Sequence, residues 1–280
     1  MDSTDWLIES IAEATGTVRT HLHDHRNKTG ATNPTGDEQI DADDWVDGVF
    51  YDALTGTDAV GAYASEERSD VVDVGEGYGV SIDPLDGSSN LLSNSVTGTI
   101  LGVYDAPLPA RGRDLVAAVL VLYGSYTTAT VATDDGVTRY VLSDGEAVDS
   151  EPVSLPDDPD IYGYAGNRRE LSDELLSTLD ELGKAYKLRY SGAMVADAAQ
   201  LLTHGGVLTY PSRDSAPSGD LRLQYESNPV AYIVERAGGA SSDGSQSILD
   251  VSPTELHQSV PTVLGSPELV ERVAAIDSSS

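Results

Sequence analysis

The stretch Asp83-Pro84-Leu85-Asp86-Gly87-Ser88-Ser89-Asn90 decides how the rest of the chain is interpreted. The apolar residues 79–82 before it alternate as in a β-strand, so a strand is predicted to end at Ile82. Two carboxylates follow, then an Asp-Gly turn and polar residues that can cap a helix. Carboxylates suit a hard cation, and the N–H groups of such a turn suit an anion. The stretch therefore predicts a loop in which a cation meets a phosphate; an ordinary acidic turn with a serine cap is the alternative at this point.

The charge of the chain is strongly negative, because 47 Asp and Glu residues stand against 16 Lys and Arg residues, for a net charge of −31. Nucleic acid and anionic membranes are therefore disfavoured partners, since both are bound by clustered basic residues. Apolar residues make up 39 % of the chain and are spread along it, which argues against a disordered acidic segment. Only three lysines occur. This composition suits a cytoplasm of about 1 M salt, where the Debye length is about 3 Å, and we interpret the chain as halophilic.

Cysteine is absent, so disulfides and thiolate chemistry are not available. The first residues lack the basic and apolar segments of a secretory signal. The longest apolar run, residues 115–123, is far shorter than the about 20 residues that span a bilayer. These features predict a soluble cytoplasmic protein, and the length of 280 residues allows one large or two ordinary domains.

Hydrophobic periodicity predicts alternating blocks of helices and strands. The expected helices cover residues 5–25, 41–54, 171–183, 193–203, a segment from Asn228-Pro229 (N-cap and N1) to Gly238, and a final one from Ser266-Pro267. The expected strands cover residues 59–64, 79–82, 97–104, 115–123, 127–132, 138–142 and 206–210. Residues 151–160, with three prolines and four acids, predict a linker between two halves.

Further acids lie at the predicted element ends. Asp37 and Asp43 flank the start of the second helix, where acids favour the helix dipole. Glu66 and Glu67 leave a strand together and can face one site only if the backbone bends there. Together with Asp83, Asp86 and Glu226 these glutamates form an oxygen-rich set suited to Mg²⁺, although each acid alone is equally explained as a solvated side chain.

Five segments in the same order resemble the fructose-1,6-bisphosphatase branch of the metal-dependent, lithium-sensitive sugar and inositol phosphatases. They are the stretch 83–90, Thr32-Asn33-Pro34-Thr35-Gly36-Asp37, Ser65-Glu66-Glu67, Arg189-Tyr190-Ser191-Gly192-Ala193-Met194-Val195-Ala196-Asp197 and Leu221-Arg222-Leu223-Gln224-Tyr225-Glu226-Ser227-Asn228-Pro229. The resemblance implies an α+β fold, a layered α/β/α/β/α sandwich. It also implies a metal- and 1-phosphate-binding half, residues 1–157, and a sugar-binding half, residues 158–280.

The resemblance implies Mg²⁺-dependent hydrolysis of the 1-phosphate of fructose 1,6-bisphosphate, a step of gluconeogenesis. Two or three Mg²⁺ ions, or Mn²⁺ instead, are then held by Glu66, Glu67, Asp83, the Leu85 carbonyl, Asp86 and Glu226. The implied catalytic residues, which position and deprotonate the attacking water, are Asp37, Asp43 and Glu67. The 1-phosphate is implied to lie against Asp86, Gly87, Ser88 and Ser89, with Arg222 adding charge.

The rest of the sugar and its second phosphate are implied to bind Asn167, Tyr190, Met194 and Tyr210, with Arg189 reaching in from a neighbouring subunit of a homodimer or homotetramer. Two features of the sequence differ from the family pattern in this sugar-binding region. The segment Tyr164-Ala165-Gly166-Asn167-Arg168 is more similar to the sedoheptulose-1,7-bisphosphatase branch, and Asp220 replaces a family lysine that would face the distal phosphate. We expect the Asp220 carboxylate to turn toward solvent rather than to bind a bridging cation. The basic residues of the AMP-inhibition site of animal enzymes have no counterpart in the short N-terminus.

Three functions stay open on the sequence alone. The first is a fructose-1,6-bisphosphatase and the second a sister activity on sedoheptulose 1,7-bisphosphate or inositol monophosphate. The third is an acidic cation-binding protein without catalysis, which would bind Mg²⁺ but release no phosphate.

Overall fold

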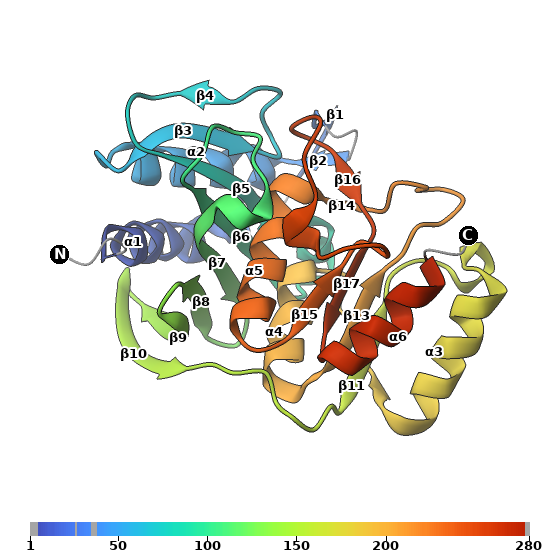
Figure 1. Cartoon of the computed structure of the whole chain (residues 1–280). Helices are drawn as coiled ribbons and strands as arrows, with labels where there is room; N and C mark the ends of the chain where they lie inside the picture. Colours follow the sequence, from blue (N-terminus) through green and yellow to red (C-terminus); the bar gives the residue numbers. More distant parts are fainter. Residues whose placement is uncertain (1–4, 26, 35–37, 278–280) are drawn as a thin grey trace.

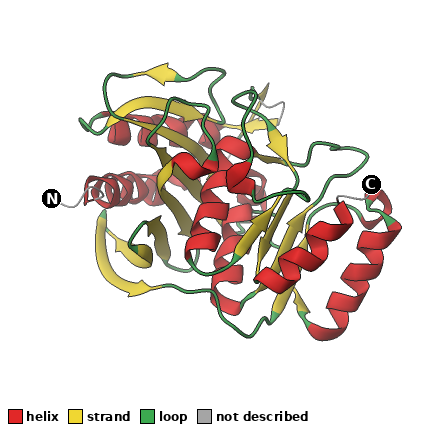
Figure 2. Cartoon of the chain, in the orientation of Figure 1, coloured by secondary structure: helices red, strands yellow, loops and turns green. Residues whose placement is uncertain are grey.

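The computed structural model describes residues 5–25, 27–34 and 38–277, arranged as alternating layers of helices and sheets (Figures 1 and 2). Helices α1 (Asp5–His21) and α2 (Asp41–Thr55) cover one face of an eight-stranded sheet. Helices α4 (Met194–His204) and α5 (Asn228–Arg236) lie between this sheet and a five-stranded one. Helices α3 (Asp173–Ala185) and α6 (Pro267–Asp277) cover the far side. The predicted α/β/α/β/α sandwich is therefore confirmed.

The eight-stranded sheet has the order β10-β9-β8-β7-β6-β5-β3-β4 and is antiparallel except for the parallel pair β3–β5. Its central strands β6 and β7 are buried on both faces, which explains the unbroken apolar sequence of β7. The strand bounds are β3 Val60–Ser65, β4 Val72–Asp73, β5 Tyr78–Asp86, β6 Thr97–Tyr104, β7 Leu115–Tyr123, β8 Thr127–Thr133, β9 Gly136–Ser143 and β10 Glu146–Pro152.

The five-stranded sheet has the order β12-β11-β13-β17-β15, with parallel pairs β11–β12 and β11–β13. Two short pairs, β1–β2 and β14–β16, lie outside both sheets. The bounds are β1 Lys28–Thr32, β2 Glu38–Ile40, β11 Ile161–Tyr164, β12 Lys187–Leu188, β13 Gly206–Tyr210, β14 Leu221–Arg222, β15 Ala240–Ser242, β16 Ser259–Val260 and β17 Thr262–Gly265.

Several local expectations were wrong, and of the five strands in the second sheet only β13 was predicted. Strand β5 does not end at Ile82 but continues to Asp86, because it keeps pairing with β6 through the acidic stretch. Strand β10 was missed, since all of its residues are exposed and it carries no apolar alternation. Asn228 is not a helix cap, because a π-helical turn, Leu223–Ser227, runs directly into α5. The division at residues 157 and 158 stays a prediction; the chain leaves the first sheet at Pro152 and enters the second at Ile161.

The packing of helices α1 and α2 explains the apolar periodicity of their sequences. Leu7, Ile11 and Val18 of α1 and Val46 and Phe50 of α2 have no exposed surface, so each helix buries one apolar stripe on the first sheet. Among the described residues, no helix has the length and apolar character needed to cross a membrane.

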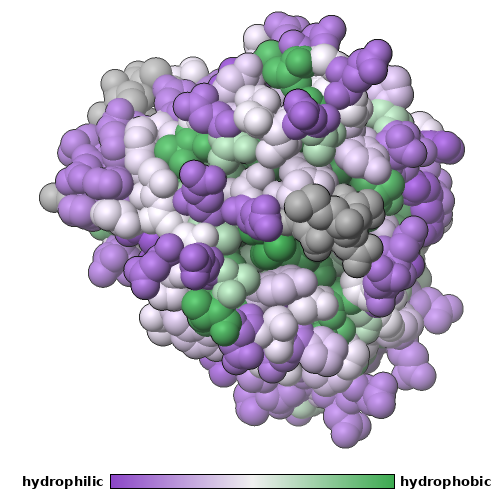
Figure 3. Space-filling model, turned by 90° about the vertical axis from the view of Figure 1, so that its left-hand side faces the viewer, coloured by the Kyte–Doolittle hydropathy of each residue, from purple (hydrophilic) through white to green (hydrophobic). Residues whose placement is uncertain are grey.

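The surface leads to a prediction about salt. Hydrophilic residues dominate the rim of the face in Figure 3, and hydrophobic ones are scattered over it. With a net charge of −31, carboxylate repulsion should be relieved as KCl screens it. We expect the Tm to rise between dilute buffer and 2 M KCl by about 10 °C or more, which for this chain length corresponds to roughly 3–5 kcal/mol. Thermal melts in KCl and in NaCl would measure this, and a Tm that is flat or falls with salt would contradict it.

Candidate active site

A β-bulge places the two aspartates of the acidic stretch in one site. Asp83 pairs with Ile100 of β6, but Asp86 pairs with Gly98, so β5 carries one residue more than its partner strand. Side chains three residues apart on a regular strand point to opposite faces, and the extra residue cancels this alternation. The bulge is fixed from inside, where the Thr99 hydroxyl donates to the Pro84 carbonyl at 2.8 Å and the Leu85 N–H to Asp83 Oδ1 at 3.0 Å.

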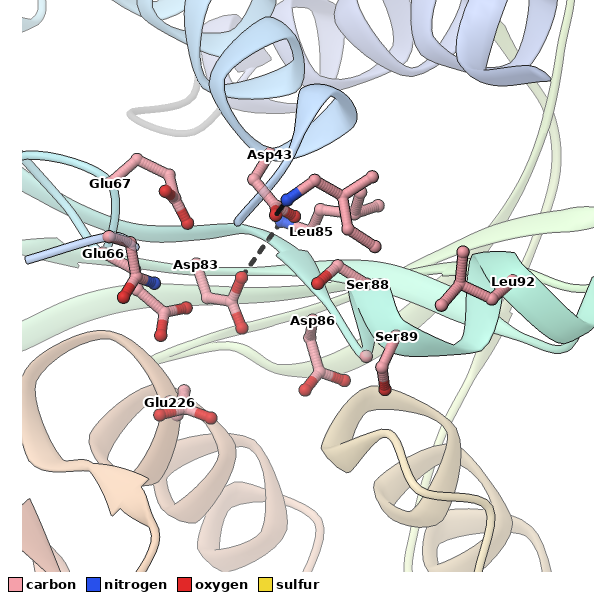
Figure 4. A pocket seen from close by; sticks show the side chains of 13 residues that line it. Asp43, Glu66, Glu67, Asp83, Leu85, Asp86, Ser88, Ser89, Leu92 and Glu226 are labelled. Atoms are coloured by element: carbon pink, nitrogen blue, oxygen red, sulfur yellow. Dashed lines mark hydrogen bonds between the residues drawn. The ribbon is translucent and has the colours of Figure 1, made fainter. Parts of the chain in front are cut away.

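The acidic cavity is the hollow of about 340 Å³ beside this bulge (Figure 4). Carboxylate oxygens of Asp83, Asp86 and Glu226 lie within 4.8 Å of one another, and all three residues are buried. Glu226 approaches from the opposite side of the cavity on the π-helical turn, with its Oε2 accepting the Arg222 N–H at 2.5 Å. The lining consists of Asn33, Ile40, Asp43, Glu66, Glu67, Asp83, Leu85, Asp86, Gly87, Ser88, Ser89, Leu92 and Glu226.

Glu66 and Glu67 both line the cavity because the chain turns sharply after β3, as the sequence required. The Arg68 N–H donates to the Ser65 carbonyl at 3.2 Å, and the Glu67 N–H donates to Ser65 Oγ at 3.2 Å. This turn replaces the strand alternation that would otherwise send the two glutamates to opposite faces.

Gly87 is required at the end of the bulge. Its φ is +73°, and a Cβ there would lie 2.4 Å from Cβ of Ala193, just before α4. The close approach lets Asp86 accept the Val195 N–H at 2.6 Å and the Met194 N–H at 3.2 Å. An aspartate from the first sheet thus meets the N-terminal turn of a helix that packs on the second.

Burial raises the pKa of three carboxyls that line the cavity, those of Asp83, Asp86 and Asp43. The pKa of Asp83 lies well above its usual value, first because of burial and then because of Glu66, Asp86 and Glu226. Burial raises the pKa of Asp86 to about 7, against the opposing effect of the Val195 and Met194 N–H groups. Burial likewise raises the pKa of Asp43 to about 6, although its Oδ2 accepts the Ile40 N–H at 2.7 Å. A divalent cation is the partner that would compensate such a set, so the donors fit Mg²⁺ or Mn²⁺.

The residues expected around the sugar lie outside the lining of the acidic cavity. The Tyr190 ring is 51 % exposed, 6.4 Å from the Tyr210 ring, while Asn167 and Arg189 are exposed. The Met194 side chain is buried, and only its N–H is directed at Asp86. The Arg222 guanidinium is hydrogen-bonded to Ser259. Asp37 lies outside the described residues.

Asp197 organises this second group and carried no signal of its own in the sequence. Its buried carboxylate accepts the Tyr210 hydroxyl at 2.8 Å, and it accepts both the N–H and the hydroxyl of Ser191, at 2.8 and 2.7 Å. The phenol hydrogen of Tyr210 is therefore already donated, so toward a ligand this residue offers an accepting oxygen and a ring.

The expected turn of Asp220 toward solvent is wrong. Its carboxylate is 29 % exposed and forms an ion pair with Arg213, which also contacts Glu170 at 3.3 Å. The Arg213 side chain lies beside Gly166, the neighbour of Asn167, because a Cβ at Gly166 would be 3.0 Å from Cδ of Arg213. At the position where the resemblance implied a lysine, the chain thus has an acid with its own arginine, a pairing that only the tertiary structure reveals.

Comparison with known proteins covers nearly the whole chain. The family model described as fructose-1-6-bisphosphatase, N-terminal domain, matches residues 7–151, and that of the C-terminal domain matches residues 155–278. A "Fructose-1,6-bisphosphatase class 1" of Halobacterium salinarum is 48 % identical, over 99 % of this chain and 96 % of the relative. "Fructose-1,6-bisphosphatase 1" of Mus musculus is 39 % identical, over 88 % of this chain and 80 % of the relative. The crystal structure of Leishmania major fructose-1,6-bisphosphatase in holo form superimposes with a TM-score of 0.91 at 28 % identity, covering 100 % of this chain and 96 % of that one.

Proposed function

Because this chain belongs to the fructose-1,6-bisphosphatase family, we propose that its acidic cavity binds two or three Mg²⁺ ions together with the 1-phosphate of the sugar. The protein is a phosphoric monoester hydrolase that converts fructose 1,6-bisphosphate to fructose 6-phosphate and phosphate, a gluconeogenic reaction. The halophilic interpretation of the charge fits the similarity to a Halobacterium salinarum protein. The observation that carries the metal proposal is the buried triad Asp83, Asp86 and Glu226, whose oxygens lie within 4.8 Å.

The proposed ligands are Glu66, Glu67, Asp83, the Leu85 carbonyl, Asp86 and Glu226. When bound, Mg²⁺ would polarise the phosphate ester and lower the pKa of a water. The bulge, the Ser65–Arg68 turn and the π-helical turn position these carboxylates around the cavity. Asp83 and Asp86 are buried, and a carboxylate removed from bulk water attracts a cation more strongly than an exposed one does.

The water and the phosphoryl group are assigned to the two sides of the bulge. Asp43 and Glu67 line the cavity, and we assign them, with Asp37, to orienting the water and taking its proton. A pKa of about 6 for Asp43 suits a group that exchanges protons near neutral pH. The N–H groups of Gly87 and Ser88, with Ser89, would hold phosphoryl oxygens at the start of a 3₁₀ turn, Ser88–Ser93.

The sugar and its distal phosphate are assigned to the second half of the chain, residues 158–280. The proposed contacts are Asn167, Tyr190, the Met194 N–H, Tyr210 and Arg222, with Arg189 of a neighbouring subunit in a homodimer or homotetramer. The exposure of the Tyr190 ring and of Arg189 supports this, since both are available to a ligand or a second subunit. The catalytic half, residues 1–157, would then contain Asp43, Glu67 and the bulge.

A panel of phosphate esters tests the substrate. In molar KCl with Mg²⁺, phosphate release should be fastest from fructose 1,6-bisphosphate, slower from sedoheptulose 1,7-bisphosphate and negligible from inositol 1-phosphate. Preference for the sedoheptulose ester would reassign the sugar half, in keeping with the Gly166-Asn167-Arg168 segment. Binding of Mg²⁺ without any phosphate release would contradict the proposal.

A further inference from the structure

The turn that carries Glu66 and Glu67 is anchored by the residue that follows them. The Arg68 guanidinium lies with its Nε and Nη2 both 2.8 Å from Oδ2 of Asp47. Asp47 belongs to α2, and its side chain is only 7 % exposed, whereas that of Arg68 is 31 % exposed. A pair of this kind joins the turn to a helix on the outer face of the first sheet.

Aromatic rings complete the anchor. The Tyr63 hydroxyl donates to the other carboxylate oxygen of Asp47, Oδ1, at 2.9 Å. The guanidinium carbon lies 4.3 Å from the centre of the Tyr51 ring and 5.4 Å from that of Tyr63, and the two rings meet edge to face at 5.1 Å. The planar guanidinium stacks on a ring and donates through two nitrogens to one carboxylate. A lysine ammonium cannot reproduce this geometry.

The same helix also positions an acid of the cavity directly. Asp43 and Asp47 are four residues apart on α2 and therefore lie on one face, one helical turn from each other. Asp43 lines the cavity, while Asp47 holds Arg68. At its other end the turn is tied to β5, where the Glu66 N–H donates to the Ile82 carbonyl at 3.1 Å. The two glutamates are thus held between two fixed points.

We propose that Arg68 and Asp47 act together as positioning residues that keep Glu66 and Glu67 in their cation-binding arrangement. This inference rests on the proposed function, because it takes the two glutamates as metal ligands. The acids of the cavity repel one another, so an unanchored turn would move outward and lose the ligand geometry. The charge of Arg68 is matched by Asp47, so the contribution to the site is geometric rather than a supply of positive charge.

A measurement of metal binding distinguishes the positioning role of Arg68 from a general contribution to stability. We expect Arg68→Gln to weaken Mn²⁺ binding to the metal-free full-length chain by about 10- to 100-fold, the usual effect of losing a residue that orients a metal ligand. Binding would be followed in molar KCl by the electron paramagnetic resonance signal of free Mn²⁺. At saturating Mn²⁺, the KM for fructose 1,6-bisphosphate should stay near the wild-type value, because the sugar contacts are untouched.

Three further variants test the geometry. Arg68→Lys keeps the charge but loses the fork and the stacking, and it should not restore Mn²⁺ affinity. The double variant Asp47→Asn, Arg68→Gln should bind Mn²⁺ as weakly as the Arg68→Gln single variant, because the two residues act as one unit. Tyr51→Leu removes only the ring under the guanidinium and should give a smaller loss in the same direction, which keeps the test usable should Arg68→Gln not fold.

The matched control is Arg139→Gln, which breaks the ion pair with Glu151 at 3.0 Å in the outer strands β9 and β10. It should leave Mn²⁺ affinity unchanged. Wild-type Mn²⁺ affinity in Arg68→Gln, or full recovery in Arg68→Lys, would overturn the positioning role while leaving the proposed function intact. A wild-type chain that binds no Mn²⁺ would overturn the proposed function, and this inference with it.

Discussion

Replacing Asp83 by asparagine is expected to reduce kcat by about a thousand-fold or more, equivalent to about 4 kcal/mol of transition-state stabilisation. The substitution keeps the shape of the side chain but removes a buried carboxylate from the centre of the acidic cavity, where it lies within 4.8 Å of Asp86 and Glu226. An amide cannot match the affinity of a carboxylate for Mg²⁺. Addition of a chelator to the wild-type enzyme should abolish turnover in the same way.

The same variant should be more stable than the wild type when no metal is present. Burial and four neighbouring acids raise the pKa of Asp83, so its charged form is unfavourable in the folded chain. Melts in chelator and molar KCl should therefore show a higher Tm for Asp83→Asn than for the wild type. Asp52→Asn, which removes an exposed charge from α2, is the control and should change neither kcat nor the Tm appreciably. Near-normal turnover of Asp83→Asn with Mg²⁺, or of the wild type in chelator, would contradict the metal site.

The second prediction is a metal-dependent pH profile of stability. The pKa of Asp86 is raised to about 7 and that of Asp43 to about 6, both by burial. The folded metal-free chain then binds more protons than the unfolded chain between pH about 4 and 7, so its free energy of unfolding falls as the pH rises through this window. For Asp86 alone, the rise from 3.8 to about 7 corresponds to on the order of 4 kcal/mol that is present at pH 4 and lost above pH 7.

Saturating Mg²⁺ should remove most of this dependence, since a bound cation favours the charged carboxylates that burial disfavours. Urea titrations in 2 M KCl between pH 4.5 and 8, with chelator and with Mg²⁺, would measure both slopes. Molar salt screens the exposed acids, so the remaining slope reports the buried ones. Asp86→Asn should flatten the slope in chelator. Equal slopes with and without Mg²⁺ would show that these carboxyls do not bind the cation.

Local patterns were sufficient for much of the fold. The helices that bury one stripe, such as α1 with Leu7 and Ile11, and the strands that are apolar throughout, such as β7, follow from periodicity because burial acts on each element separately. Strand β10 could not be predicted from the sequence, because a fully exposed edge strand has no apolar alternation. The π-helical turn before Asn228 could not be predicted either, since an Asn-Pro pair by itself indicates a helix start.

The sequence by itself determined the kinds of group available to the site: the acids suited to a cation, the need for a bend if Glu66 and Glu67 are to face one place, and two aspartates, Asp83 and Asp86, at an Asp-Gly turn. Only the tertiary structure decided which distant groups meet. It brought the N-terminal turn of α4 to Asp86, Arg213 to Asp220 and Asp47 to Arg68. The physical reason is that side-chain type and spacing are local properties of the chain. Contacts between these segments depend instead on how two sheets and their helices pack, and a short motif carries no record of that packing.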